Sequence, residues 1–338
     1  MKTDFRYIAL RFTIVFLMIF FSFHGTCALR SENDIDISQL SEKYLPVFQE
    51  VNDWLEKKPD LKPGDLEREK MLKKLDEPLS EPQANEMPAV GWFFRERTRA
   101  FVEDFEGTDV KEGVAIWKLY NHGVAIRTPE LTIAIDLIKG FDEVQWDEEM
   151  LDKAINGMDI LLITHEHADH ADRRIVEKFV EAGKKVIAPN SLFLWEHEDI
   201  GKSITRLRGD SITINGVKIT AFAGYQILTP NNIYLIETPE GIRIMHLGDD
   251  NETVKMGSEW FRKFNPPMEI DVLIPNSWCP NLAFLMQFVK PKIIISSHEH
   301  EISHRTEGRR SYDYVYKVLS TLNVPFTVPA WGEKFVFE

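Results

Sequence analysis

Short apolar runs separated by turn residues make up the chain from about Val114 onwards. Runs rich in β-branched residues have the length and composition of strands: VAIWKLY, GVAIRT, LTIAIDLI, MDILLIT, KKVIAP, SITINGVKITAF, NIYLIET, GIRIMHLGD, IDVLIP and KIIIS. Asn-Gly at 215–216 and Pro-Glu-Gly at 239–241 predict hairpin turns, and apolar residues at helical spacing indicate helices over 172–182 and 312–322. Residues 111–338 are therefore predicted to form one large domain of mixed α/β character.

Residues 31–90 are polar and rich in Lys, Glu and Pro. Apolar residues recur at helical spacing between Ser38 and Lys57, which predicts a short amphipathic helix. The prolines that follow predict irregular connections: Pro59, Pro63, Pro78, Pro82 and Pro88. We expect residues 29–110 to be an N-terminal extension, partly helical, that wraps on the main domain; a partly disordered linker is the alternative.

The N-terminus has the order of a secretory signal peptide. Three basic residues precede the apolar run Phe12–Phe23, and small residues follow it up to Ala28. The run is shorter than the roughly 20 residues that span a bilayer. We expect cleavage near Ala28, removal of residues 1–28 and export to a periplasm or to the medium. An uncleaved membrane anchor is the alternative, if the run extends back to Tyr7 and Arg11 is tolerated.

Composition narrows the classes of partner. Of the 338 residues 43% are hydrophobic and 28% are charged, which is typical of globular proteins. The 54 acidic and 40 basic residues give a net charge of −14, which disfavours nucleic acid and anionic lipid as partners. Two cysteines are too few for a disulfide scaffold. We expect a small-molecule or lipid-like substrate, no nucleic acid, and membrane contact only through an uncleaved N-terminal segment.

The strongest chemical signal is THEHADH at 164–170, directly after an apolar strand. His165 and His167 lie two apart, so on an extended segment both imidazoles can bind one ion. Asp169 and His170 can bind a second ion nearby. Imidazole and carboxylate ligands favour zinc, one or two ions, with manganese or iron as alternatives. The competing interpretation is a polar turn in which Asp169 caps the following helix.

Two other strands end in residues that can bind metal. The first ends in Gly-Asp, where Asp249 can bridge two ions or stabilise the turn. The second ends in His298, the preferred ligand, with His300 as the runner-up. His246 lies inside an apolar run, so we expect a core histidine or one that supports a ligand.

These residues resemble the metallo-β-lactamase-fold superfamily: H-x-H-x-D-H at 165–170, Gly-Asp at 248–249 and His298 after the terminal strand. The chain looks most like the ascorbate-phosphate lactonase-like branch, because of Ile135-Asp136, the segments 246–249 and 270–275, and Val289-Lys290-Pro291-Lys292. The resemblance covers about Val114 to the C-terminus.

It implies a four-layer αββα sandwich with the metal ions at one edge of two sheets. By the same resemblance His165 and His167 hold one ion, while Asp169, His170 and His298 hold the other. Asp249 bridges the two ions.

One departure from the superfamily stands out. Its members usually carry another histidine on the strand before the Gly-Asp hairpin, but no histidine lies between His197 and His246 here. Gln226 or Tyr225 can stand in, although Gln is a poor zinc ligand beside imidazole. Both one and two bound ions therefore remain open.

The leading hypothesis is a metal-dependent hydrolase of an ester, lactone or phosphodiester. Asp249 is expected to orient the attacking water and Asp169 to receive or relay its proton. Tyr225 can donate to the developing oxyanion or be a packed aromatic residue. Residues 276–279 are expected to line the pocket, with Cys279 a soft ligand or a small buried residue.

Two other functions are open. The missing histidine favours a non-catalytic metal- or ligand-binding protein of the same fold. A redox enzyme that uses iron is compatible with the ligand types. A basic group formed by Arg305, Arg309 and Arg310 is either a solvated helix entry or a site for an anionic head group.

Overall fold

The structure, a computed structural model, describes residues 36–58, 60–189, 199–251, 260–264, 266–279 and 282–338. The predicted signal peptide, residues 1–28, lies outside this part. Ile37–Glu338 form one compact unit. No helix in the described ranges is both long and apolar enough to cross a membrane.

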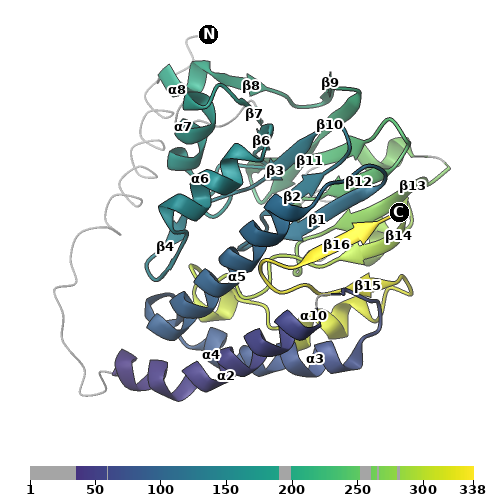
Figure 1. The fold of residues 1–338 in the computed structure, drawn as a ribbon. Helices are drawn as coiled ribbons and strands as arrows, with labels where there is room; N and C mark the ends of the chain where they lie inside the picture. Colours follow the sequence, from purple (N-terminus) through teal and green to yellow (C-terminus); the bar gives the residue numbers. More distant parts are fainter. Residues whose placement is uncertain (1–35, 59, 190–198, 252–259, 265, 280–281) are drawn as a thin grey trace, which may run out of the picture. The chain divides into compact units, whose positions relative to one another are not determined.

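Two seven-stranded sheets form the centre of the molecule (Figure 1). The first sheet has the order β16-β1-β2-β3-β6-β7-β8 and the second β15-β14-β13-β12-β11-β10-β9. The strands of the first sheet are β1 (Val114–Lys118), β2 (Val124–Arg127), β3 (Thr132–Ile135), β6 (Ile160–Leu162), β7 (Lys185–Ala188), β8 (Ile204–Arg206) and β16 (Lys334–Phe337). Those of the second are β9 (Asp210–Ile214), β10 (Val217–Gln226), β11 (Thr229–Glu237), β12 (Arg243–His246), β13 (Met268–Ile274), β14 (Val289–Ile295) and β15 (Phe326–Thr327). A small ribbon pairs β4 (Gly140–Phe141) with β5 (Val144–Gln145).

The hairpins form where the turn residues predict them. Asn215 and Gly216 both adopt positive φ between β9 and β10, and residues 238–242 connect β11 to β12. Alternate residues of each strand face opposite sides of its sheet. Those between the sheets form one cluster, with members such as Ile116, Ile135, Tyr234 and Val272. This burial on both faces explains why the strands read as nearly continuous apolar runs.

Helices cover the outer faces of the sheets (Figure 1). They are α2 (Ile37–Lys57), α3 (Leu66–Leu72), η1 (Lys73–Leu75), α4 (Asp76–Ser80), η2 (Ala84–Glu86), α5 (Pro88–Gly107), α6 (Glu148–Asn156), α7 (Arg173–Glu181), α8 (Asp199–Lys202), η4 (Trp260–Lys263), α9 (Leu282–Leu285), η5 (Thr306–Gly308) and α10 (Tyr312–Leu319). The predicted helices over 172–182 and 312–322 correspond to α7 and α10. The fold is thus the predicted α/β sandwich with an N-terminal helix.

The N-terminal extension is more helical than its prolines suggested. The predicted helix extends over 21 residues as α2, and Pro78 and Pro88 lie inside α4 and at the start of α5. The expectation of irregular connections is wrong at these two prolines, because proline is tolerated in the first turn of a helix, where its missing N–H needs no partner. Pro63 and Pro82 lie in turns between helices, as expected, and Pro59 lies outside the described residues.

Buried polar contacts join the extension to the end of the chain. Arg68 donates to Glu333 over 2.5 Å, and both side chains are almost completely buried. Arg97 donates to the carbonyl oxygen of Trp331 over 3.0 Å. The ring of Phe94 on α5 also packs edge-on against Trp331. Since a buried charge is tolerated only when it is paired, these contacts fix the extension against the sheet.

Candidate metal centre

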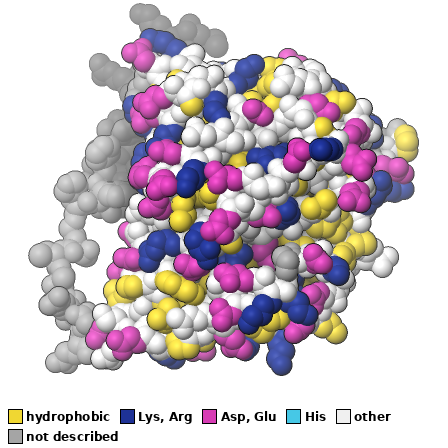
Figure 2. Space-filling view, viewed as in Figure 1, with side chains coloured by type: hydrophobic (Ala, Val, Ile, Leu, Met, Phe, Trp, Pro, Cys, Tyr) yellow, Lys and Arg dark blue, Asp and Glu magenta, His cyan; other side chains and the backbone are white. Residues whose placement is uncertain are grey.

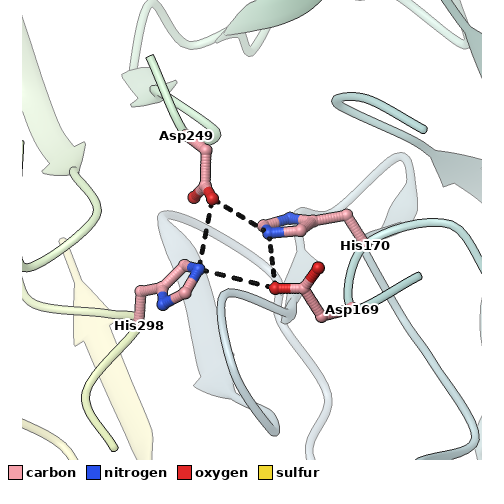
Figure 3. Close-up of side chains that lie close together, drawn as sticks. All are labelled: Asp169, His170, Asp249 and His298. Carbon is pink, nitrogen blue, oxygen red and sulfur yellow. Dashed lines mark ion pairs between the residues drawn. The ribbon is translucent and has the colours of Figure 1, made fainter. Parts of the chain in front are cut away.

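Loops that follow three strands of the two sheets converge at one edge of the sandwich. Asp169 and His170 follow β6, Asp249 follows β12 and His298 follows β14. Their ligand atoms all lie within 4.8 Å of one another, and all four residues are buried. In Figure 3 the two imidazoles and the two carboxylates point toward a common centre.

Asp249 Oδ2 is the contact that the two histidines of this group share. It lies 3.4 Å from His170 Nε2 and 3.3 Å from His298 Nε2. Asp169 Oδ2 completes the group, at 3.2 Å from His170 Nε2 and 3.7 Å from His298 Nε2. We call these four residues the four-donor group.

His165 and His167 lie next to the four-donor group. His165 Nε2 is 4.0 Å from Asp249 Oδ2, and the His165 ring lies 4.1 Å from that of His170 and 4.7 Å from that of His167. His165 is fully buried and His167 is half-buried. The structure therefore brings all six predicted metal ligands to one place.

Of the two residues considered as stand-ins for the missing histidine, Gln226, the last residue of β10, contacts Asp249. Its Nε2 donates to Asp249 Oδ2 over 2.9 Å. Tyr225 does not take this role, because neighbouring residues of a strand point to opposite faces. The Arg208 guanidinium lies 4.9 Å from the centroid of its ring, so the contacts of Tyr225 are those of a packed aromatic residue.

Asp136 orients two of the histidines, His170 directly and His165 through the Thr164 hydroxyl. His170 Nδ1 donates to its Oδ2 over 2.8 Å, and the Thr164 hydroxyl donates to the same oxygen over 2.6 Å. The Thr164 hydroxyl lies 3.0 Å from His165 Nδ1, from which it accepts. With both Nδ1 atoms engaged, the Nε2 atoms of His165 and His170 are left for the centre.

The turn between β1 and β2 contributes two residues that the sequence analysis missed. Asn121 donates from Nδ2 to Asp169 Oδ2 over 2.9 Å. His122 Nε2 lies 3.1 Å from the carbonyl oxygen of Gly248, to which it donates. The signal available in the sequence was a histidine in the turn between two strongly apolar strands.

His246 supports the segment that carries Asp249. Its Nδ1 accepts from the Gly248 N–H over 3.1 Å, and its Nε2 donates to the carbonyl oxygen of His122 over 3.0 Å. Both ring nitrogens are thus engaged by the backbone. This is the arrangement expected of a buried supporting histidine and leaves no lone pair for an ion.

The three histidines after β14 lie in different surroundings. His298 and His300 both have left-handed backbones, with φ of +68° and +45°. His300 donates from Nε2 to Asp76 Oδ1 on α4 over 2.7 Å, so it contacts the extension and not the four-donor group. His304, which the sequence analysis did not select, has Nε2 3.9 Å from Asp169 Oδ2 and a side chain that is 42% exposed.

The other roles considered in the sequence analysis, a helix cap, a soft metal ligand and an anion site, are decided by the following contacts. Asp172, not Asp169, caps α7, because its carboxylate accepts from the N–H of Arg174. Cys279 Sγ lies 3.4 Å from the carbonyl oxygen of Asp250, to which it donates. Arg309 donates to the carbonyl oxygens of Leu79 and Glu81, so it ties the extension to this loop and is not free for an anion.

Burial and charge set the protonation of the centre. Burial, reinforced by the nearby His170, lowers the pKa of His165 well below its usual value. Burial opposes charge on His170 too, but Asp169, Asp249 and Asp136 raise its pKa well above the usual value. Despite burial, His298 and His170 hold the pKa of Asp249 well below its usual range. Without metal, protons on His170 and His298 thus balance ionised carboxylates.

Unpartnered atoms test whether a metal ion fits. Among the described residues, His165 Nε2, His170 Nε2 and Asp249 Oδ1 are buried and have no hydrogen-bond partner. Buried polar atoms rarely lack a hydrogen-bond partner, because each such atom lowers the stability of the fold. Imidazole nitrogens and carboxylate oxygens are ligands for zinc, manganese and iron, so the centre fits a divalent ion.

The chain is similar to several solved structures. Igni18, a metallo hydrolase from the archaeon Ignicoccus hospitalis, is 16% identical over 67% of this chain and 98% of its own, with a TM-score of 0.49. An isothiocyanate hydrolase from Delia radicum gut bacteria is 15% identical over 66% and 99%, with a TM-score of 0.51. A variant of CmlA, a diiron β-hydroxylase from Streptomyces venezuelae, is 12% identical over 68% and 55%, with a TM-score of 0.50.

No curated protein sequence matches the chain. The profile of a family described as "Beta-lactamase superfamily domain" matches residues 118–298. This range begins in β1 and ends at His298, so it contains every residue of the two groups around Asp249. Because the match covers more than half of the sequence, the chain belongs to the β-lactamase superfamily, with the metallo-β-lactamase fold that its motif predicted.

Proposed function

We propose that the protein is a zinc-dependent hydrolase of an ester, a lactone or a phosphodiester. The observation that carries the proposal is Asp249, a buried carboxylate whose Oδ2 lies within 4.0 Å of the Nε2 atoms of His165, His170 and His298. Its Oδ1 has no partner among the described residues, although the residue is fully buried. A centre of this kind is built to hold a cation and to leave one acceptor oxygen for a polar reactant.

The four-donor group would hold the more tightly bound ion. It offers two imidazoles and two carboxylates, whose ligand atoms lie within 4.8 Å of one another. Next to this group His165 and His167 share Asp249 with Gln226, whose amide N–H uses part of the acceptor capacity of Oδ2. A bound ion supplies Lewis acidity and lowers the pKa of water to about 7.

The residues of the chain do the rest of the chemistry. Asp249 Oδ1 orients the attacking water. Asp169 receives its proton. Asn121 holds the Asp169 carboxylate in place through its amide. The half-exposed His304 lies beside Asp169, with its Nε2 3.9 Å from Asp169 Oδ2.

Metal content and turnover test this proposal together. Purified residues 29–338, loaded with zinc, should bind one or two ions and hydrolyse p-nitrophenyl acetate, a γ-lactone or bis(p-nitrophenyl) phosphate. Asp249→Asn should lose bound zinc and at least about 100-fold in rate. Asp210→Asn, an equivalent charge change at an exposed position of β9, should alter neither.

Two results would contradict the proposal in different ways. Zinc binding without hydrolysis of any of the three substrates would favour the non-catalytic binding protein. A preference for iron over zinc, with a visible absorption band that responds to reductant, would favour the redox enzyme. Export with cleavage near Ala28 and a small-molecule or lipid-like substrate belong to the same proposal, and mass spectrometry of the native N-terminus tests the cleavage.

A further inference from the structure

The hairpin that joins β10 to β11 exposes two large apolar side chains beside the metal centre. Ile227 is 63% exposed and Leu228 is 75% exposed. They form a two-residue loop between the paired residues Gln226 and Thr229. Most other large apolar residues of the described part are buried or partly buried, so this apolar tip is a local exception.

The backbone of the tip makes the choice of residues more unusual. Ile227 has φ of +55°, whereas Leu228 is not among the residues with positive φ. A two-residue hairpin loop of this pattern normally places glycine first, because a Cβ is disfavoured at positive φ and a β-branched side chain most of all. Glycine would relieve this strain and expose less apolar surface. Isoleucine at position 227 therefore does not stabilise the fold relative to glycine.

The tip is held firmly at the rim of the centre. Asn251 Oδ1 accepts from the Ile227 N–H over 3.0 Å, and the Asn251 N–H donates to the Tyr225 carbonyl over 3.1 Å. Gln226, the residue before the tip, donates to Asp249. With about 3.3 Å of rise per residue, both apolar side chains start within about 7 Å of the residue that contacts Asp249.

We propose that Ile227 and Leu228 bind the hydrocarbon chain of the substrate while its hydrolysable group lies at Asp249. This inference rests on the proposed function and narrows it to substrates with an alkyl or acyl chain. Backbone strain such as the positive φ of Ile227 often occurs at binding sites. An apolar residue that is kept at the rim of a site despite such strain is typical of a position selected for binding.

Two other occupants fit the observations less well. Two side chains are far too small for a stable contact with a second copy, since specific protein interfaces bury roughly 1,200 Å² or more. The net charge of −14 disfavours an anionic bilayer. The face in Figure 2 is consistent with this, since acidic and basic side chains are interspersed on it and no basic region stands out.

Chain-length preference tests the proposal. The zinc-loaded protein should hydrolyse p-nitrophenyl octanoate with a higher kcat/KM than p-nitrophenyl acetate, gaining about fourfold for each methylene that is buried. Leu228→Ser should lower kcat/KM about tenfold for the octanoate and less than twofold for the acetate. Leu66→Ser, which changes a leucine that is 77% exposed on α3, should alter neither.

Ile227→Gly separates binding from folding. It should keep or raise Tm, because it relieves the positive-φ strain, and should still reduce the preference for octanoate. Equal losses for both esters, or a wild-type protein without chain-length preference, would overturn the proposal.

Direct binding keeps this test independent of hydrolysis. Calorimetry with decanoate and propionate on the zinc-loaded protein should show tighter binding of decanoate, lost in Leu228→Ser. That result without turnover of any ester would refute the proposed function and leave the apolar site standing. Turnover of the esters without any difference in binding between the two acids would refute the apolar site and leave the proposed function standing. If Leu228→Ser only weakens binding to phosphatidylcholine vesicles, or only dissociates a dimer in sedimentation, the tip has another occupant and the proposal fails.

Discussion

The four-donor group and the pair His165 and His167 use the same kinds of side chain but differ in burial and in the number of donors that converge. In the four-donor group, two carboxylates and two imidazoles come together, all buried. In the other group, His167 is half-buried, His165 Nε2 lies 4.0 Å from Asp249 Oδ2, and the Gln226 amide donates to that oxygen. The donors around Asp249 are therefore asymmetric: four of them converge, and the other two lie beside the carboxylate that they share with Gln226.

Removing one histidine from each group should distinguish the two groups most clearly. His298→Ala should weaken binding of the first zinc ion by more than about 100-fold, because it removes a member of the four-donor group. His167→Ala should change that affinity by less than about tenfold. Competition with a zinc-sensitive dye measures both values. Equal losses in the two variants would show that the two groups are not distinct.

The effect of pH on zinc binding should follow from the protons that the four-donor group carries in the metal-free protein. The pKa of His170 is raised well above its usual value, and that of His298 is raised too, both by the carboxylates around them. Zinc must displace these protons, so its apparent affinity should fall as pH falls through the raised pKa values, by about tenfold per pH unit for each proton.

The stability of the metal-free protein should depend on pH in the opposite sense. A histidine with a pKa raised in the folded state stabilises the fold below its unfolded pKa, and this stability is lost as pH rises through the folded pKa. The gain in Tm on adding zinc should therefore be larger at pH 8 than at pH 6. Thermal unfolding with and without zinc measures it, and a gain that does not change with pH would argue against protonated histidines in the empty site.

Gln226→His should add an imidazole beside Asp249. An imidazole at this place can bind an ion, which the amide does poorly, so the affinity for a second zinc ion should rise about tenfold or more. Elemental analysis at low free zinc should then approach two ions per chain. Tyr225→His, which puts an imidazole on the opposite face of the same strand, is the matched control. Stoichiometry that stays unchanged in Gln226→His would show that another feature limits the second position.

The smallest effect is expected from the extension, which contacts the loop that carries His298. Asp76 Oδ1 accepts from His300 Nε2 and from the Tyr312 N–H, both over 2.7 Å. Asp76→Ala should lower the free energy of unfolding by about 1–2 kcal/mol and weaken zinc binding a few-fold, because the loop that carries His298 is less restrained.

Asp65→Ala is the matched control for this variant. Asp65 caps α3 in the same extension, where it accepts from the N–H groups of Glu67 and Arg68 and does not contact His300. Asp65→Ala should lower the free energy of unfolding by a similar amount and leave zinc affinity unchanged. Parallel loss of zinc affinity in both variants would mean that general destabilisation, and not the Asp76–His300 contact, sets the affinity.

The sequence by itself determined the local features. Short apolar runs rich in β-branched residues located the strands, and H-x-H-x-D-H, Asp249 and His298 were found because each directly follows an apolar strand. Spacing along a strand is a local property, so one sequence is enough to recognise it.

Only the tertiary structure decided which of these loops share a centre and what supports them. Asn121 reaches Asp169, Asp136 orients His170, and Asp76 holds His300 through contacts between segments 34 to 224 residues apart. The choice of Gln226 over Tyr225 depends on which face of β10 meets Asp249, and the helices around Pro78 and Pro88 depend on burial against the sheet. Register between strands and packing of distant segments make these choices, and no spacing along the chain encodes them.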